Sequence, residues 1–332
     1  METRDELEIV KVSNDNVDGL SEIFKACFNA NVDRPYFEWK YFDNPIGDAI
    51  AFMALDGERV AAFYGVIPEK YSVANKEVLV FQSMDTMTHP DYQRRGLFSK
   101  LANVTYDYVT AEFGEYFLVG IPGMSSFPGF VKKLNWKDIH MFQYLFLSKT
   151  IFKLRRPFRS QTDADFTAVS SMTSDLEQFL SRQRPPDKKI HPVLSTAFFN
   201  WRVFGHPFLG YKVIQIRVAG EIIGICVFIV EENGRSLICF TEFSEHEHYS
   251  RYSAALMDHL FSVSGSRILY TWEPLTELLR HAYGRCGFIK NPFKRGPFSY
   301  RIPYIVRSNS ESVRSVDIFN ITNYDLQPLM QD

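Results

Sequence analysis

The residues of this chain best suited to chemistry lie between positions 82 and 101, in the run QSMDTMTHPDYQRRGLFSKL. A strand-like segment leads into a turn over residues 89–92, and a helical pattern begins directly after a basic glycine loop. Free backbone N–H groups at a helix N-terminus bind anions, arginines add positive charge, and a glycine lets the backbone approach closely. We therefore predict a phosphate site made of Gln93, Arg94, Arg95, Gly96, Leu97 and Phe98. The alternative is a turn with solvated arginines in front of an ordinary amphipathic helix.

Two side chains beside this loop could take up a proton. Asp85 lies on the strand that precedes the loop, and His89 stands before a proline. A carboxylate or an imidazole near a protonated amine can serve as general base, commonly through water. The alternatives are that Asp85 caps the loop or pairs with Arg94 or Arg95, and that His89 only shapes the turn. Both alternatives stay open on the sequence alone.

The elements that must position these residues follow from apolar periodicity. Before the loop we expect a strand at 7–12, helices at 18–29 and 35–42, a strand pair at 49–55 and 59–68, and a strand at 78–88. After it we expect a helix at 97–112, a buried strand at 116–121, a short helix at 127–134 and a closing strand at 141–147. The run of consecutive strands at 49–88 argues against a nucleotide-binding βαβ unit.

The second half of the chain repeats the first. FEWKYFDNP at 37–45 returns as FNWRVFGHP at 199–207, Asp56-Gly57-Glu58 returns as Ala219-Gly220-Glu221, and KLNW at 133–136 returns as RCGF at 285–288. Three correspondences in the same order predict a tandem duplication. We place the domains at 1–148 and 191–332, joined by a linker at 149–190 that contains one helix. The second copy reads EHEHYSRY at 245–252, which has carboxylates and no glycine, so only the first copy is expected to bind phosphate.

Composition narrows the class of protein. With 332 residues, 45% hydrophobic residues and a net charge of −2, the chain reads as a globular protein without a general field for nucleic acid or anionic membrane, and its predicted strands and helices place it in the α/β class. Any polyanion affinity would have to be local. The N-terminus lacks a signal-like apolar region, and the four cysteines are scattered, so we expect reduced thiols and a cytoplasmic location.

The predicted order, β-α-α-β-β-β-loop-α-β-α-β, resembles that of the GNAT N-acyltransferases. The loop is similar to their acyl-CoA pyrophosphate motif, Gln/Arg-x-x-Gly-x-Gly/Ala, although Phe98 stands where the family has Gly or Ala. The resemblance implies a mixed-sheet fold with two tandem GNAT-like domains, the second degenerate. It also implies acetyl-CoA or another short acyl-CoA as co-substrate and no metal.

GNAT enzymes pass the acyl group from CoA directly to an amine. By this resemblance the pantetheine arm would lie along the strand edge at 84–88, and a backbone N–H of Met87 or Thr88 would bind the oxyanion. Asp85 and His89 are the candidate bases. The family's acid tyrosine would fall at or beside Val131, so that role is unassigned, whereas the second copy carries Tyr283. Trp39, Lys40, Trp201, Arg202 and His206 are candidate substrate contacts, with a packed core as the alternative for the tryptophans.

The acceptor is the least constrained part of the prediction. The runs THPDYQRRGLFSKL and IPGMSSFPGFVKKLNWK look most like bacterial N-acyltransferases of nucleotide-linked amino sugars, such as dTDP-amino-dideoxyhexoses used in surface-polysaccharide precursors. Another small amine or a peptide is the first alternative, and a non-catalytic acyl-CoA-binding module is the second. A homodimer would fit the duplicated sheet edges.

Overall fold

The computed structural model describes residues 7–155, 162–182, 188–291, 295–296, 298–310 and 312–331. The chain divides into two compact units. The first unit comprises Met1–His140 and Pro303–Ile321, and the second comprises Met141–Ile302 and Thr322–Asp332. Each unit therefore takes most of its residues from one half of the chain and a short segment from the other.

The first unit is built on a mixed sheet in the order β1-β2-β3-β4-β5-β14. Its strands are β1 (Glu8–Lys11), β2 (Ile50–Asp56), β3 (Arg59–Val73), β4 (Lys76–Thr88), β5 (Phe117–Gly120) and β14 (Arg301–Ser308, which enters this unit from Pro303). β4 and β5 are parallel, whereas β14 runs antiparallel to β5, with Ile305 opposite Gly120. A small hairpin of β15 (Ser312–Val313) and β16 (Val316–Asp317) follows.

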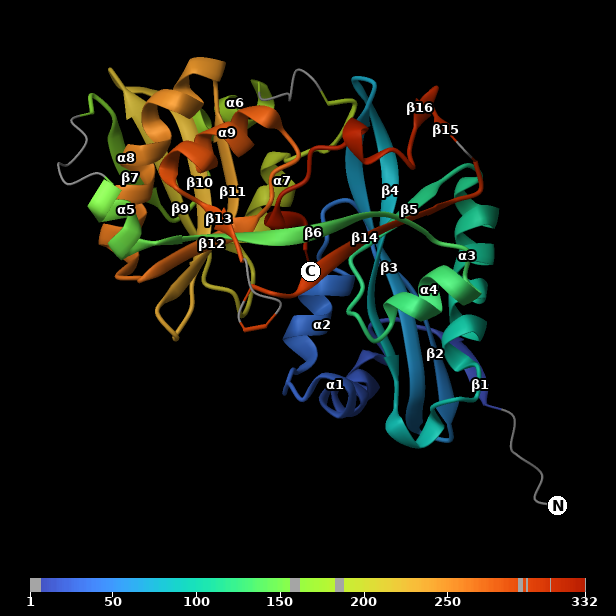
Figure 1. Cartoon of the computed structure of the whole chain (residues 1–332). Coiled ribbons are helices and arrows are strands. Elements are labelled where there is room, and N and C mark those ends of the chain that lie inside the picture. Colours follow the sequence, from blue (N-terminus) through green and yellow to red (C-terminus); the bar gives the residue numbers. More distant parts are fainter. Residues whose placement is uncertain are drawn as a thin grey trace. The chain divides into compact units, whose positions relative to one another are not determined.

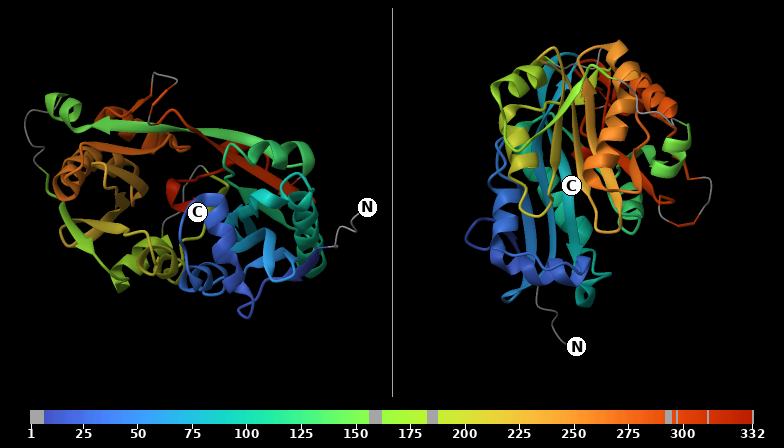
Figure 2. Two further views of the ribbon diagram at one scale, coloured as in Figure 1. Left: turned by 90° about the horizontal axis from the view of Figure 1, so that it is seen from below. Right: turned by 90° about the vertical axis from the view of Figure 1, so that its left-hand side faces the viewer.

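Helices cover both faces of this sheet (Figures 1 and 2). The helices are α1 (Leu20–Phe28), α2 (Arg34–Tyr41), α3 (Leu97–Phe113) and α4 (Phe127–Lys133), with short turns η1 (Val17–Gly19) and η2 (Pro90–Tyr92). Neighbouring residues of β3 contact helices on the two sides of the sheet, because successive strand residues point to opposite faces. Phe63 stacks on Tyr41 of α2 at 5.5 Å between ring centroids, and Tyr64 packs 6.2 Å from Phe98 of α3.

The second unit repeats this plan with the strand order β6-β12-β11-β10-β9-β7. Its strands are β6 (Lys137–Ser148, from Met141 on), β7 (Asp165–Val169), β9 (Lys212–Val218), β10 (Glu221–Val230), β11 (Arg235–Phe243) and β12 (Ile268–Trp272), with short strands β8 (Ile190–Pro192) and β13 (Ile289–Lys290). β11 and β12 are parallel, and β6 runs antiparallel to β12. Each of the six strands in this order thus has a counterpart in the order of the first unit.

Two helical layers also flank the second sheet. The helices are α5 (Lys149–Arg155), α6 (Ser174–Arg182), α7 (Thr196–Phe199), α8 (His246–Ser264) and α9 (Glu277–Cys286), with a π-helical turn η3 (Asn200–Phe204) and the turns η4 (Ile321–Asn323) and η5 (Pro328–Met330). α8 and α9 share one apolar core with one face of the sheet, and α6 and η3 share another with the opposite face (Figure 1). No described helix is long and apolar enough to cross a bilayer.

The units differ from the predicted domains at both ends. The strand predicted to close the first domain, β6, pairs with β12 of the second unit, and β14 from the C-terminal half takes the matching place beside β5. The predicted linker is also part of the second unit, since β7 pairs with β9 through Asp165–Val169. The residues of a strand indicate that it is a strand, but they do not identify the strand with which it pairs. The sequence therefore did not predict that β6 joins the second unit and β14 the first.

The duplication is visible in the register of the two hairpins. Asp56 pairs with Arg59 and Val218 pairs with Glu221, so each hairpin turns through two residues. This makes Ala219 the counterpart of Gly57, one residue away from the alignment predicted above. Both residues have a left-handed backbone, with φ of 61° at Gly57 and 50° at Ala219, as tight hairpin turns require.

One carboxyl group of the second unit is expected to make stability depend on pH. Tyr249 donates a hydrogen bond of 2.8 Å to Glu242 on β11. Burial, reinforced by the charge of Asp325, raises the pKa of Glu242 from 4.5 to about 8 despite that hydrogen bond. A pKa raised in the folded state gives stability that is complete below the unfolded pKa and is lost as the pH rises through the folded one.

We therefore expect Glu242→Gln to flatten the fall in unfolding free energy between pH 5 and pH 9. Glutamine keeps the acceptor for Tyr249 and cannot ionise. Chemical denaturation of wild type and variant at both pH values measures the effect. Glu247→Gln, which changes an exposed carboxyl on α8, is the control. Equal pH dependence in wild type and Glu242→Gln would contradict the assignment.

Candidate active site

The first unit opens where two parallel strands part. β4 pairs with β5 only from Phe81 to Ser83, opposite Leu118 to Gly120. β5 ends at Gly120, whereas β4 continues to Thr88. The last five residues of β4 therefore present a strand edge beside the end of β5, and an extended ligand can bind such an edge as an added strand.

A β-bulge shapes this edge. Phe63 pairs with Met87 and Gly65 with Met84, so two residues of β4, Asp85 and Thr86, lie opposite the single residue Tyr64. Asp85 has a left-handed backbone with φ of 42°, which aspartate tolerates better than most residues. A bulge increases the local twist of a strand and redirects its side chains, and bulges are common next to active sites.

The direction of the backbone groups distinguishes the two predicted oxyanion donors. His89 donates its N–H to Ala61 of β3 at 3.0 Å. Because N–H groups alternate between the two edges of a strand, the N–H of Met87 also points towards β3, and that of Thr88 points towards the opening. Thr88 is thus the better placed of the pair. Its carbonyl accepts a weak hydrogen bond from the thiol of Cys27 at 3.5 Å.

Asp85 is paired, although not with the arginines considered above. Its Oδ2 lies 2.6 Å from Nζ of Lys40 and accepts a hydrogen bond of 2.8 Å from the Tyr41 hydroxyl. The side chains of Lys40 and Asp85 are only 2% and 10% exposed. Lys40, predicted to contact substrate, is therefore a buried partner of the bulge, and its neighbour Trp39 is buried as well. These contacts tie α2 to β4 directly at the opening.

His89 is held inside the turn that follows β4. Arg59, which can only donate, lies with Nη2 2.9 Å from Nε2 of His89, so that ring nitrogen is the acceptor. Nδ1 faces the backbone N–H of Asp91 at 3.3 Å and its carboxylate at 3.5 Å. With Nε2 occupied by a guanidinium, this geometry favours a structural role for His89 over that of a general base.

The glycine loop is exposed and free of side-chain caps. Residues 93–96 are all exposed, Arg94 and Gly96 have left-handed backbones with φ of 64° and 77°, and Gly96 is the N-cap of α3 without a capping side chain. Arg95 lies over the Tyr92 ring at 4.8 Å and donates to the Asp91 carbonyl. Among the described residues the Arg94 side chain makes no hydrogen bond or ion pair. The loop can therefore offer backbone N–H groups and one free guanidinium to an anion.

Phe98, the departure from the family motif, is accommodated by a glycine on α4. Its ring lies 5.1 Å from that of Phe130, and a Cβ atom built on Gly129 would stand 2.9 Å from the ring. Glycine at position 129 thus provides the space that the phenylalanine fills. The Phe98 side chain packs towards α4. Its backbone N–H belongs to the first turn of α3 and therefore lies at the helix N-terminus. Gly129 has no sequence signal of its own that could have indicated this contact.

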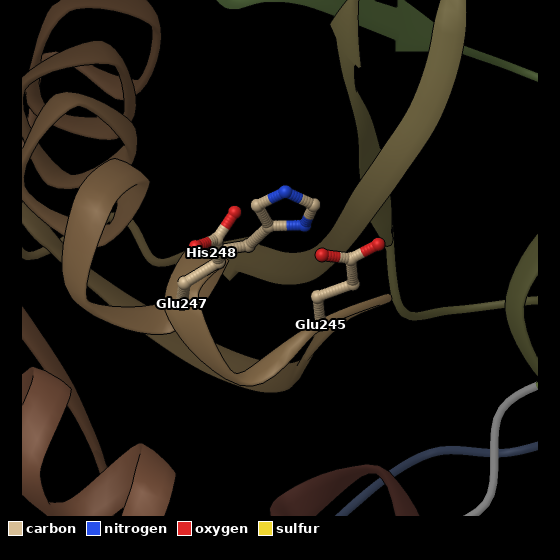
Figure 3. A group of neighbouring side chains, drawn as sticks. All are labelled: Glu245, Glu247 and His248. Atoms are coloured by element: carbon tan, nitrogen blue, oxygen red, sulfur yellow. The ribbon is translucent and has the colours of Figure 1, made fainter.

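The second unit lacks the loop altogether. Eight residues, 89–96, separate β4 from α3, whereas only Ser244 and Glu245 separate β11 from α8. Figure 3 shows Glu245, Glu247 and His248 at this junction. One carboxylate oxygen of each glutamate and one ring nitrogen of the histidine lie within 4.8 Å of one another. His248 also contacts the Ser244 hydroxyl at 3.1 Å. Two carboxylates here oppose phosphate binding.

The strand edge of the second unit is closed by a side chain. Ser244 donates its N–H to Ile223 as His89 does to Ala61, so counting back three residues places Thr241 at the position of Thr86. The buried Gln327 accepts from the Thr241 N–H at 2.9 Å and donates to its carbonyl at 3.1 Å. This amide makes the two hydrogen bonds that an added strand would make.

The predicted substrate residues of the second unit are engaged within it. Arg202, the counterpart of Lys40, donates to the carbonyls of Leu329 and Gln331, and Trp201 is buried. Nδ1 of His206 accepts from the N–H groups of Phe208 and Leu209 at 3.2 and 3.0 Å. These side chains therefore order the C-terminal segment and the loop after η3.

The two units differ at the position where the family has its acid tyrosine. Val131 is half-buried on α4. Its counterpart Tyr283 on α9 donates to the Thr241 hydroxyl at 3.1 Å, and burial raises the pKa of Tyr283 above its ordinary value. The tyrosine thus lies in the unit whose strand edge is already closed. The first unit has no tyrosine at this position.

Comparison with known proteins agrees with this architecture. Residues 8–139 match the family model of the acetyltransferase (GNAT) domain. No curated protein sequence matches the chain. Among solved structures, a probable N-acyltransferase of unknown function from Enterococcus faecalis V583 is 10% identical, with a TM-score of 0.69 over 91% of this chain and 72% of that one.

Two further structures share the doubled fold. A tandem GNAT protein from the clavulanic acid biosynthesis pathway is 12% identical, with a TM-score of 0.62 over 93% of this chain and 100% of that one. N-myristoyltransferase of Saccharomyces cerevisiae with bound myristoyl-CoA is 10% identical, with a TM-score of 0.60 over 98% and 85%. Residues 8–139 therefore match the GNAT acetyltransferase domain, and the chain as a whole has a fold similar to that of the tandem GNAT protein.

Proposed function

We propose that the first unit holds acyl-CoA in the opening between β4 and β5 and passes the acyl group directly to an amine. The observation that carries this proposal is that the open edge of β4 leads straight into an uncapped helix N-terminus, across the loop of residues 93–96. The edge suits the amide groups of pantetheine, and the loop suits a pyrophosphate. In the second unit both features are missing, so we propose one acyl-CoA per chain.

The proposed reaction forms a C–N bond and breaks a C–S bond and an N–H bond. The neutral amine attacks the thioester carbon, the N–H of Thr88 stabilises the oxyanion, and the C–S bond breaks to release CoA thiolate. The nitrogen, which becomes positively charged on attack, loses one proton to water to give the amide, because Asp85 and His89 are both occupied by other partners. A thiol has an ordinary pKa near 8.5, so the thiolate can leave without a tyrosine.

We propose a nucleotide-linked amino sugar as the acceptor. This part of the proposal is supported by the similarity of residues 88–101 and 121–137 to bacterial N-acyltransferases of such sugars. A binding module without catalysis is the second candidate, and the observation that favours it is Val131 in the tyrosine slot.

An acceptor screen separates these functions. Purified protein with acetyl-CoA should release free CoA thiol only when an amine is supplied, and fastest with an amino-sugar nucleotide. Thiol release is followed with a chromogenic disulfide, and calorimetry reports CoA binding separately. Faster release with a polyamine or a peptide amine would reject the sugar. Tight CoA binding without release for any amine would support the binding module.

The loop is tested by Gly96→Glu. A carboxylate at this position repels the pyrophosphate, and a side chain is strained at φ of 77°, so acetyl-CoA binding should weaken at least a hundredfold. Gly220→Glu is the matched control, because Gly220 also has a left-handed backbone, φ of 86°, and open space around its Cβ position. Calorimetry should give the same acetyl-CoA affinity for wild type and control. Equal loss of binding in both variants would refute the assignment.

The buried ion pair is tested by Lys40→Met. Removing the ammonium leaves a buried carboxylate without its cation, which costs about 3–5 kcal/mol of stability. If the pair also fixes the bulge, kcat should fall at least tenfold while the KM for acetyl-CoA changes little.

The double variant Lys40→Met/Asp85→Asn separates stability from positioning. Asparagine keeps the left-handed backbone and removes the buried charge, so the unfolding free energy should recover while kcat stays low. Recovery of kcat together with stability would show that the pair matters for folding alone. Arg34→Met, at an exposed cation at the start of α2, is the control for loss of charge.

A further inference from the structure

A second cluster of cations lies in the second unit, away from the GNAT site. A cavity of about 920 Å³ lies where the end of β6 and α5 meet the turn between β10 and β11 and the start of β12. It is lined by Ser148, Lys149, Thr150, Lys153, Leu154, Asn233, Gly234, Arg235, Arg267 and Ile268. Four of these ten residues are cationic and none is acidic. The volume lies in the range of small-molecule sites.

The four cations differ in whether other groups of the protein already bind them. Arg235 is paired with Glu231 at 3.0 Å and also donates to Asn233. Lys149 donates to the Phe261 carbonyl at 3.2 Å, which holds the ammonium without neutralising it. Three positive charges therefore remain uncompensated at this cavity, those of Lys149, Lys153 and Arg267.

Arg267 is the best placed of them. Its backbone N–H donates to Gly234 at 2.8 Å, and its Nε would lie 3.3 Å from a Cβ atom at that glycine. The guanidinium thus rests against the Gly234 backbone, where a larger residue would displace it. Within the described chain, neither Arg267 nor Lys153 makes a side-chain hydrogen bond or an ion pair. Their donors are free for a ligand.

The location of the cavity shows that it is not a remnant of an acyl-CoA loop in the second unit. That loop would lie after the C-terminal end of β11, at Ser244 and Glu245, whereas the cavity borders the first residue of the same strand, Arg235. A chain with a net charge of −2 has no general attraction for anions, so four cations accompanied by the single paired carboxylate of Glu231 create a local positive field. A planar guanidinium and two ammonium groups are typical ligands of phosphate oxygens.

We propose that this cavity is a second binding site, for a small molecule that carries a di- or triphosphate group. Arg267 binds the phosphate through its guanidinium, and Lys149 and Lys153 supply charge beside it. Leu154 and Ile268 give the cavity an apolar wall for the remainder of the ligand.

Titration calorimetry with sodium pyrophosphate tests the site, using Gly96→Glu protein to remove the anion loop of the first unit. One binding event per chain should remain. Adding Arg267→Ala and Lys153→Ala should weaken it at least tenfold. The charge-matched control adds Arg182→Ala and Lys212→Ala, two exposed cations of the same unit outside the cavity, and should leave binding unchanged.

Three outcomes would overturn the proposal. The first is absence of pyrophosphate binding to the Gly96→Glu protein, and the second is equal weakening by the control pair, which would indicate bulk charge. The third is binding of citrate as tight as that of pyrophosphate, which would reject phosphate as the recognised group. Thermal unfolding of each variant confirms that it is folded, and acyltransferase activity is not needed for any of these measurements.

Discussion

The separation of β4 from β5 is the constraint on which the rest of the first unit depends. Parallel strands that part expose backbone N–H and C=O groups, and such groups need partners wherever water is excluded. The two units meet this requirement differently. In the second unit the Gln327 amide supplies both hydrogen bonds to Thr241, whereas in the first the edge ends at the exposed glycine loop. The same architecture therefore gives a closed edge in one unit and an open edge in the other.

A single duplicated position shows how the units diverged. Lys40 and Arg202 lie at the same place in FEWKYF and FNWRVF, and each is buried beside the bulged strand of its unit. In the first unit the strand carries Asp85, which binds the ammonium. In the second, Arg202 binds carbonyls of the C-terminal segment, which also brings Gln327 to the strand. The matching cation thus binds the bulged strand itself in one copy and, in the other, the segment whose Gln327 closes the strand edge.

The sequence predicted features that depend on local patterns. The end of β4 at Thr88 and the start of α3 at Leu97 fall where periodicity and turn residues place them. It did not predict contacts between distant segments. Asp85 finds Lys40 rather than a neighbouring arginine, Phe98 finds Gly129, and β6 and β14 exchange places. None of these has a signal in residue type or spacing, because each depends on how the layers pack.

The first turns of α3 and α8 explain why one helix start suits phosphate and the other does not. A helix N-terminus carries about half a positive charge, which acidic side chains in the first turn compensate. α8 has Glu245 at its N-cap and Glu247 in its first turn, so its own carboxylates supply the negative charge. α3 begins after Gly96, with no acidic residue in its first turn and no capping side chain. Its positive end is therefore left for a charge from outside the chain.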